Sequence, residues 1–136
     1  MASTMQVLVA TAEREVYRGE AEFLVAPGAA GELGIYPKHC PLLASLATGE
    51  LRITSGDHID EVFVSGGFIE IQPDMITVLS DSAERAGDID EAAAIEAARI
   101  AKEMVETTQG DIDYAKAEAE LSMTAARLAW LRKKKR

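Results

Sequence analysis

Few residues in the chain have the side chains and spacing that chemistry requires, and the first to consider is the run Lys38-His39-Cys40-Pro41. A histidine beside a cysteine could bind a metal ion or form a nucleophile with its base. A four-ligand zinc site needs more partners, however, and the other histidine, His58, stands at no recognisable ligand spacing. With one cysteine, neither an intrachain disulfide nor a multi-cysteine site can form. We therefore expect Cys40 to be a packing or surface residue, and we expect no metal site and no cofactor.

Other patterns typical of catalytic sites are incomplete. The glycine-rich stretch 28–34 contains no lysine and so does not form a phosphate-binding loop. Ser65-Gly66-Gly67 is better explained as a turn than as a nucleophile elbow. Acidic pairs such as Asp88/Asp90 are typical of a helix cap, with no buried context that would raise a pKa for acid–base work. The sequence therefore predicts a non-catalytic protein.

The composition is that of a soluble globular protein. Of 136 residues, 48% are hydrophobic and 27% charged, which excludes wholesale disorder. No apolar run approaches the roughly 20 residues of a membrane-spanning helix, and the first residues lack the pattern of a secretory signal. If the protein serves a membrane, we expect it to do so from the water side.

Charge is distributed unevenly along the chain. The net charge of −9 disfavours nucleic acid as a partner. The last ten residues contain six basic and no acidic side chains, which leaves −15 for the other 126 residues. The basic residues are Arg127, Arg132, Lys133, Lys134, Lys135 and Arg136.

Up to about residue 84 the sequence is typical of β-strands. Short runs rich in Val, Ile, Phe and Thr alternate with Gly, Pro, Asp and Ser. The runs are 5–11, 21–26, 51–54, 59–64, 68–72 and 75–79, and the last four should form a meander of hairpins. Phe68, Glu70 and Gln72 should point to one side of their strand and Ile69 and Ile71 to the other. We expect antiparallel sheets, stacked face to face or closed on themselves.

Beyond residue 85 the apolar spacing becomes helical. Asp88 and Glu91 form a plausible capping box for a helix over 89–106. Gly110 suits the end of that helix, and a second helix runs toward the C-terminus. The expected apolar stripes are Ile89, Ala93, Ala97, Ile100 and Met104 on the first helix, and Ala117, Leu121, Ala125, Leu128 and Leu131 or Arg132 on the second. So short a connection predicts an antiparallel hairpin.

The hairpin is rich in alanine, which has two opposing consequences. Alanine has the highest helix propensity, but an alanine contact buries little apolar area. Gly87 and Gly110 stand at the two junctions, where backbone angles change easily. Either the hairpin can relocate on these hinges without unfolding, or it is a static appendage whose alanines only permit close packing.

Three stretches resemble a known family. Gly31-Glu32-Leu33-Gly34-Ile35-Tyr36-Pro37-Lys38-His39-Cys40-Pro41-Leu42-Leu43 resembles the segment GELGIYPGHAPLL of the epsilon subunits of F-type ATP synthases. The run from Val64 to Pro73 is similar to their SGGFLEVQP hairpin, and Thr77-Val78-Leu79-Ser80-Asp81 follows it in family order. Gly110-Asp111-Ile112-Asp113-Tyr114-Ala115 is similar to the hairpin loop and second-helix start of the proteobacterial-type members. The resemblance covers essentially the whole chain.

The resemblance implies a fold and a place. The fold is α+β: an N-terminal antiparallel β-sandwich of about ten strands over 1–85, then a C-terminal antiparallel α-helical hairpin over 86–136. The implied place is the foot of the central stalk, between the gamma subunit and the c-ring. Glu32, Tyr36 and His39 would lie in the part that meets the c-ring or gamma, although a plain surface role is the alternative.

The resemblance also suggests what the helical part does. In the family the extended second helix reaches the alpha and beta subunits, where beta presents acidic residues, and the cationic end of this chain would suit that surface. The alternatives are a solubilising tail or, more weakly, a site for lipid or nucleic acid. Some members bind ATP through a motif that Ile89 and Asp90 match here. Its arginine is replaced by Ala93, so ATP sensing is not expected.

We therefore expect a non-catalytic rotor subunit of a proton-translocating ATP synthase that couples gamma to the c-ring and inhibits ATP hydrolysis through its C-terminal helices. It would lie peripherally on the cytoplasmic face of the bacterial plasma (inner) membrane, in contact with lipid only through the complex. The rival interpretation is a free-standing interaction module that binds an unrelated acidic partner. An enzyme with a bound cofactor comes third.

Overall fold

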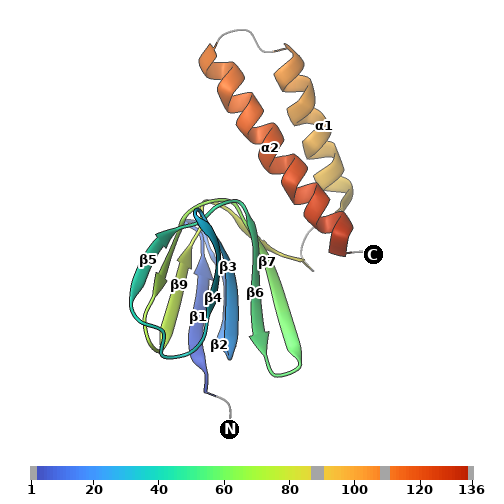
Figure 1. Ribbon diagram of the computed structural model, residues 1–136. Coiled ribbons are helices and arrows are strands. Elements are labelled where there is room, and N and C mark those ends of the chain that lie inside the picture. Colours follow the sequence, from blue (N-terminus) through green and yellow to red (C-terminus); the bar gives the residue numbers. More distant parts are fainter. Residues whose placement is uncertain (1–2, 87–90, 108–110, 135–136) are drawn as a thin grey trace. The chain divides into compact units, whose positions relative to one another are not determined.

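The protein divides into a strand-built unit and a helix-built unit. The structure, a computed structural model, describes residues 3–86, 91–107 and 111–134. The two compact units are Met1–Ala86 and Gly87–Arg136 (Figure 1).

The first unit is a β-sandwich of two five-stranded sheets. One sheet has the order β2-β1-β9-β8-β5 and the other β10-β7-β6-β3-β4. The strands are β1 Met5–Ala10, β2 Glu15–Ala21, β3 Phe23–Gly28, β4 Gly31–Ile35, β5 Leu42–Ser45, β6 Gly49–Ser55, β7 His58–Val64, β8 Phe68–Ile71, β9 Met75–Leu79 and β10 Ala83–Arg85. In the described residues, the predicted sandwich of about ten strands is confirmed.

One strand pair departs from the antiparallel prediction. β1 and β9 run parallel, with Val7 opposite Ile76 and Val9 opposite Val78. The two strands are far apart in the sequence. The long connection between them allows a parallel pair, which a tight hairpin turn could not join.

The predicted four-strand meander is wrong at its centre. β6 pairs with β7 and β8 with β9, but Ser65-Gly66-Gly67 carries the chain from one sheet to the other. Gly67 has a φ of 104°, and a Cβ atom there would overlap the carbonyl oxygen of Leu79. Only glycine fits this crossing, because the backbones pass too closely for a side chain.

The core of the sandwich lies between the two sheets and consists of aliphatic side chains drawn from residues 5–83. Ile69 and Ile71 are buried while Phe68 and Glu70 are exposed, which confirms the predicted alternation. The largest fully buried side chains are Val7, Val9, Leu24, Ile35, Leu51, Ile53, Val62, Val64, Ile69, Ile71, Ile76 and Val78. Burial of so much aliphatic surface is the main stabilising term for this unit.

The second unit is the predicted α-helical hairpin. α1 spans Glu91–Thr107 and α2 spans Asp111–Lys134, and the two helices lie side by side in opposite directions (Figure 1). In the described part of the chain, neither helix is long and apolar enough to cross a membrane.

The buried seam of the hairpin differs from the predicted stripes. On α1 the buried residues are Ala94 and Ala101, while Ile100 and Met104 of the predicted stripe are exposed. On α2 Ala117 and Leu131 of the predicted stripe are buried, but Ala125 is exposed and its neighbour Thr124 is buried, as is Trp130. The Thr124 hydroxyl donates to the carbonyl of Glu120 at 2.9 Å, so its burial leaves no hydroxyl proton unsatisfied.

The observed seam has the spacing of a coiled coil. Among the buried and half-buried positions, 94, 98, 101 and 105 of α1 and 117, 121, 124, 128 and 131 of α2 form two regular series, flanked by other half-buried positions such as 97 and 127. Steps of four and three residues give a period of 3.5, which keeps one face of each helix directed at its partner. Alanine at this seam permits the helices to approach closely.

Candidate functional site

The cysteine and histidine of the run 38–41 lie on the surface of the sandwich. Cys40 is exposed, with its Sγ 3.8 Å from Nδ1 of His39. That nitrogen donates a hydrogen bond to the carbonyl of Cys40 at 2.6 Å, so it is already bonded to the adjacent residue. No group of three or more metal-ligating side chains occurs among the described residues.

Two of the predicted interface residues share the outer face of one sheet. Glu32 lies on β4, and Tyr36 follows the last residue of β4 in the same alternation; both are exposed, whereas Ile35 between them is buried. Glu32 Oε1 lies 3.5 Å from Arg52 Nη2. The Tyr36 ring packs against Phe23, with centroids 4.4 Å apart and planes tilted by 40°. Carboxylate, guanidinium and aromatic groups are therefore available on one surface.

The third predicted residue, His39, lies in the segment that crosses from β4 to β5. At its start Lys38 adopts a φ of 67°, the left-handed region that non-glycine residues rarely occupy. The Lys38 N–H donates to the carbonyl of Pro73 at 2.7 Å, which ties the crossing to the β8–β9 turn. The structure thus places His39 beyond the end of β4, three residues after Tyr36.

A shallow groove adjoins Glu32. It is formed by residues 28–33 of the β3–β4 turn together with Ala44 and Ser45 of β5, and its volume is about 260 Å³. The small side chains that line it leave the backbone accessible, so the groove could receive a protruding side chain of a partner.

An apolar face on the other sheet was not predicted. Leu43, Phe68 and Leu79 are 67%, 57% and 55% exposed. They lie on the adjacent strands β5, β8 and β9, and Phe68 stands directly opposite Leu79. The sequence carried a signal for this surface, since Phe68 alternates in phase with Glu70 and therefore had to point outward. Neighbouring exposed apolar side chains of this kind are a candidate interaction surface.

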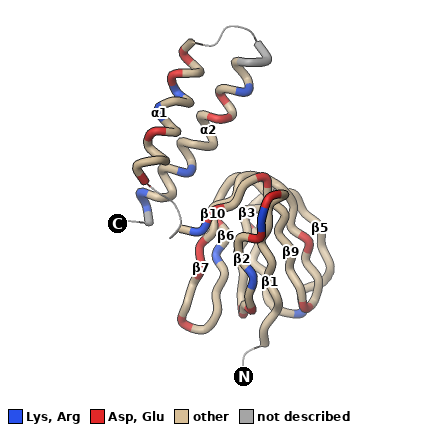
Figure 2. Tube along the Cα trace, turned by 180° about the vertical axis from the view of Figure 1, so that it is seen from behind, with Lys and Arg blue, Asp and Glu red and all other residues tan. Residues whose placement is uncertain are grey.

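The C-terminal end of α2 is basic, as predicted (Figure 2). Arg132 and Lys133 are exposed and Arg127 is half-buried. The side chains of Lys134, Lys135 and Arg136 lie outside the described residues, as do the predicted hinges Gly87 and Gly110 and the motif residues Ile89 and Asp90. Two exposed cations within the last turn also complement the negative end of the helix dipole.

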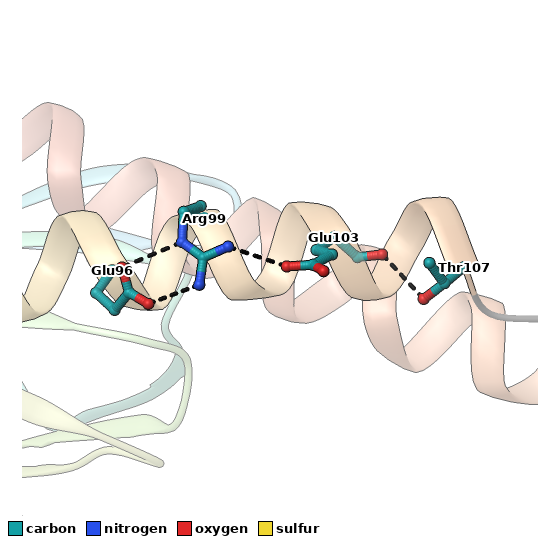
Figure 3. A network of polar contacts seen from close by, with 4 residues as sticks. All are labelled: Glu96, Arg99, Glu103 and Thr107. Carbon is teal, nitrogen blue, oxygen red and sulfur yellow. Dashed lines mark hydrogen bonds and ion pairs between the residues drawn. The ribbon is translucent and has the colours of Figure 1, made fainter.

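Arg99 on α1 is committed to its own helix (Figure 3). It donates from Nε and Nη2 to Glu96 at 3.1 and 2.7 Å, and from Nη1 to Glu103 at 3.0 Å. The hydrogen bond from Arg99 lowers the pKa of Glu96, and the same contact raises the pKa of Arg99. These (i, i+3) and (i, i+4) pairs favour the helix. They also occupy the Arg99 guanidinium. We therefore do not expect Arg99 to take the place of the motif's arginine, which is replaced by Ala93 in this chain.

Comparison with known proteins covers both units. The family model described as "ATP synthase, Delta/Epsilon chain, beta-sandwich domain" matches residues 4–86. The model described as "ATP synthase, Delta/Epsilon chain, long alpha-helix domain" matches residues 88–130.

Two curated relatives are named "ATP synthase epsilon chain". The protein of Acidithiobacillus ferridurans is 52% identical over 128 residues, which cover 94% of this chain and 91% of the relative. The protein of Janthinobacterium sp. (strain Marseille) is 50% identical over 131 residues, covering 95% and 94%.

Two solved structures share the fold. A chain of the Euglena gracilis mitochondrial ATP synthase (OSCP/F1/c-ring, rotational state 1) is similar with a TM-score of 0.77 and 18% identity, covering 94% of this chain and 81% of that one. A chain of the Tetrahymena thermophila mitochondrial ATP synthase central stalk and c-ring has a TM-score of 0.56 and 15% identity, covering 93% and 97%.

Proposed function

The chain belongs to the delta/epsilon-chain family of ATP synthase subunits, and from this premise we propose that it is a rotor subunit which joins the gamma subunit to the c-ring and restrains ATP hydrolysis. Epsilon chains are non-catalytic subunits. The observation that carries the proposal is the exposed apolar face of the sandwich, formed by Leu43, Phe68 and Leu79. Such a face suits a subunit that docks on a partner protein.

The apolar face is the proposed contact with gamma. Its three side chains lie on adjacent strands of a sheet whose inner side already packs the core. Complete burial of such a side chain from full exposure contributes about 1.5–3 kcal/mol, and burial of the 55–67% that is still exposed would contribute somewhat more than half of that for each residue. A rigid sheet presents these groups without having to order them first, which lowers the entropic cost of binding.

The polar surface around Glu32 is the proposed contact with the c-ring. Glu32 and Arg52 form an exposed ion pair at 3.5 Å, which is weak because solvent screens both charges. Glu32 can therefore exchange Arg52 for a cationic or polar group of a partner. Tyr36 and His39 would extend this surface along the crossing to β5.

The helical unit is the proposed inhibitory element. Arg132 and Lys133 offer exposed positive charge at the end of α2, and Lys134, Lys135 and Arg136 continue the basic run in the sequence. Such a tip suits an acidic surface of the beta subunit within the alpha–beta head. The attraction would guide docking and would weaken as salt screens it. Gly87 and Gly110 are the proposed hinges.

The proposed location follows from the partners. A subunit held between gamma and the c-ring would lie peripherally on the cytoplasmic face of the bacterial inner membrane. It would reach lipid only indirectly, through the complex.

Co-purification tests the proposed docking face. A tagged chain should bring down gamma from a detergent extract of the native membrane, and Phe68→Ser should reduce the recovered gamma about tenfold or more, as expected for a central apolar contact. Ile59→Ser is the matched control, because Ile59 is 52% exposed but lies on β7 of the other sheet. Recovery of an unrelated acidic protein in place of gamma would support the free-standing interaction module instead.

A further inference from the structure

The last strand of the sandwich is held by an arginine that contacts both sheets. β10 has only three residues and pairs with β7 alone, with Arg85 opposite Val62. β10 ends at Arg85, and the first unit ends at the next residue, Ala86. So short an edge strand has few backbone hydrogen bonds of its own, and its attachment depends on side chains.

Arg85 makes its first contact within its own sheet. Its Nη2 donates to Asp60 Oδ1 of β7 at 2.8 Å, and the Asp60 side chain is only 15% exposed. Nε2 of His58 lies 3.2 Å from the same oxygen. A charge-assisted hydrogen bond to a largely buried carboxylate is stronger than an exposed ion pair.

Arg85 makes its second contact with the opposite sheet. Its guanidinium carbon lies 5.7 Å from the centroid of the Tyr17 ring on β2, within the range of a cation–π interaction. β2 and β10 are edge strands of different sheets, and in the fully described range 3–86 no strand pairing joins them. Burial and the Asp60 charge raise the pKa of Tyr17, while the Arg85 charge lowers it, so the phenol is electrostatically part of the same cluster.

We propose that Arg85, Asp60 and Tyr17 form a clasp that closes the open edge of the sandwich and fixes the point at which the link to the helical unit begins. With the clasp closed, the link starts at residue 86. With it open, β10 can leave the sheet edge and add its three residues to the link, which extends the reach of the helices. This inference does not depend on the proposed function.

Amide hydrogen exchange of the full-length protein tests the clasp. Arg85→Met keeps much of the apolar stem but removes both contacts, so exchange in residues 83–86 should rise about tenfold while exchange in β1 and β9 stays unchanged. Arg18→Met is the matched control, because it removes an exposed ion pair with Glu15 at 2.7 Å from β2, the strand that carries Tyr17, without removing either contact of the clasp. It should leave residues 83–86 unchanged.

Two further variants keep the test decisive if Arg85→Met folds poorly. Tyr17→Leu removes the ring face and keeps the ion pair, so it should give a smaller rise confined to residues 83–86. Asp60→Asn should also raise exchange there, and adding Arg85→Met to it should raise exchange only by about as much as Tyr17→Leu does, since the ion pair is already broken and only the Tyr17 contact remains to be lost. Unchanged exchange in residues 83–86, or an equal rise throughout the sandwich, would overturn the proposal.

Discussion

Among the described residues, Lys38 is the one non-glycine residue with a positive φ. Its φ of 67° lies in the left-handed region, and the family segment it resembles has glycine at this place. The strained residue stands beside His39 and two positions after Tyr36, within the surface proposed to meet the c-ring. Its conformation therefore sets how that surface is presented.

Replacing Lys38 by glycine should stabilise the protein. The left-handed conformation costs a non-glycine residue roughly 1–2 kcal/mol, of which the greater freedom of glycine in the unfolded chain takes back part. Lys38→Gly should therefore raise the free energy of unfolding by about 0.5–1 kcal/mol, measured by urea denaturation. Lys38→Ala is the control and should bring no comparable gain, because alanine retains the Cβ atom. Equal gains in both variants would show that the lysine side chain, rather than its backbone, causes the strain.

At the scale of elements, the strands that the sequence pattern predicted are the interior ones. The runs near 5–11, 21–26, 51–54, 59–64, 68–72 and 75–79 correspond to β1, β3, β6, β7, β8 and β9. The four strands that the pattern did not reveal, β2, β4, β5 and β10, are the four sheet edges. An edge strand pairs on one side only and is partly exposed, so its sequence needs fewer apolar residues and β4 even contains two glycines. Only the family resemblance supplied the count of ten.

The helix faces were harder to predict for a different reason. Alanine occurs on several faces of α1, so apolar spacing alone could not distinguish the seam at Ala94 and Ala101 from the exposed stripe that ends at Ile100 and Met104. On α1 size decides the outcome: the buried alanines permit the closest helix approach, and the larger Ile100 and Met104 are left outside. The apolar face around Phe68 was not predicted either, because hydropathy alone does not distinguish an apolar side chain that packs in the core from one that is exposed.

A substitution at the alanine seam tests this account. Ala101 is buried between the helices, whereas Ala93 on the same helix is exposed. Ala101→Ile should force the helices apart and destabilise the helical unit by about 1–3 kcal/mol, through overpacking. Ala93→Ile carries the same loss of helix propensity without the clash, and it should have a much smaller effect. Faster amide exchange in α1 and α2 reports the difference, and equal effects in the two variants would contradict the close-packed seam.

At the scale of the whole molecule, the two units can be separated experimentally because the core of the sandwich does not depend on the helices. All residues of that core cluster come from positions 5–83, and the apolar face and the surface around Glu32 also belong to the first unit. Deleting residues 88–136 should therefore leave assembly with gamma and the c-ring intact. Measuring the subunit content of the purified truncated complex checks this expectation.

The same truncation separates coupling from inhibition. If the helical unit blocks the catalytic head, its loss should raise the rate of ATP hydrolysis several-fold, while proton-driven synthesis continues because the sandwich remains in place. Reversing the exposed charges with Arg132→Glu and Lys133→Glu in the full-length chain should raise hydrolysis in the same direction, and high salt should mimic that change by screening the tip. A truncated complex that hydrolyses ATP at the original rate would remove the inhibitory role and leave the coupling role standing. Activation by truncation but not by charge reversal would assign inhibition to the bulk of the helices and the basic tip to solubility.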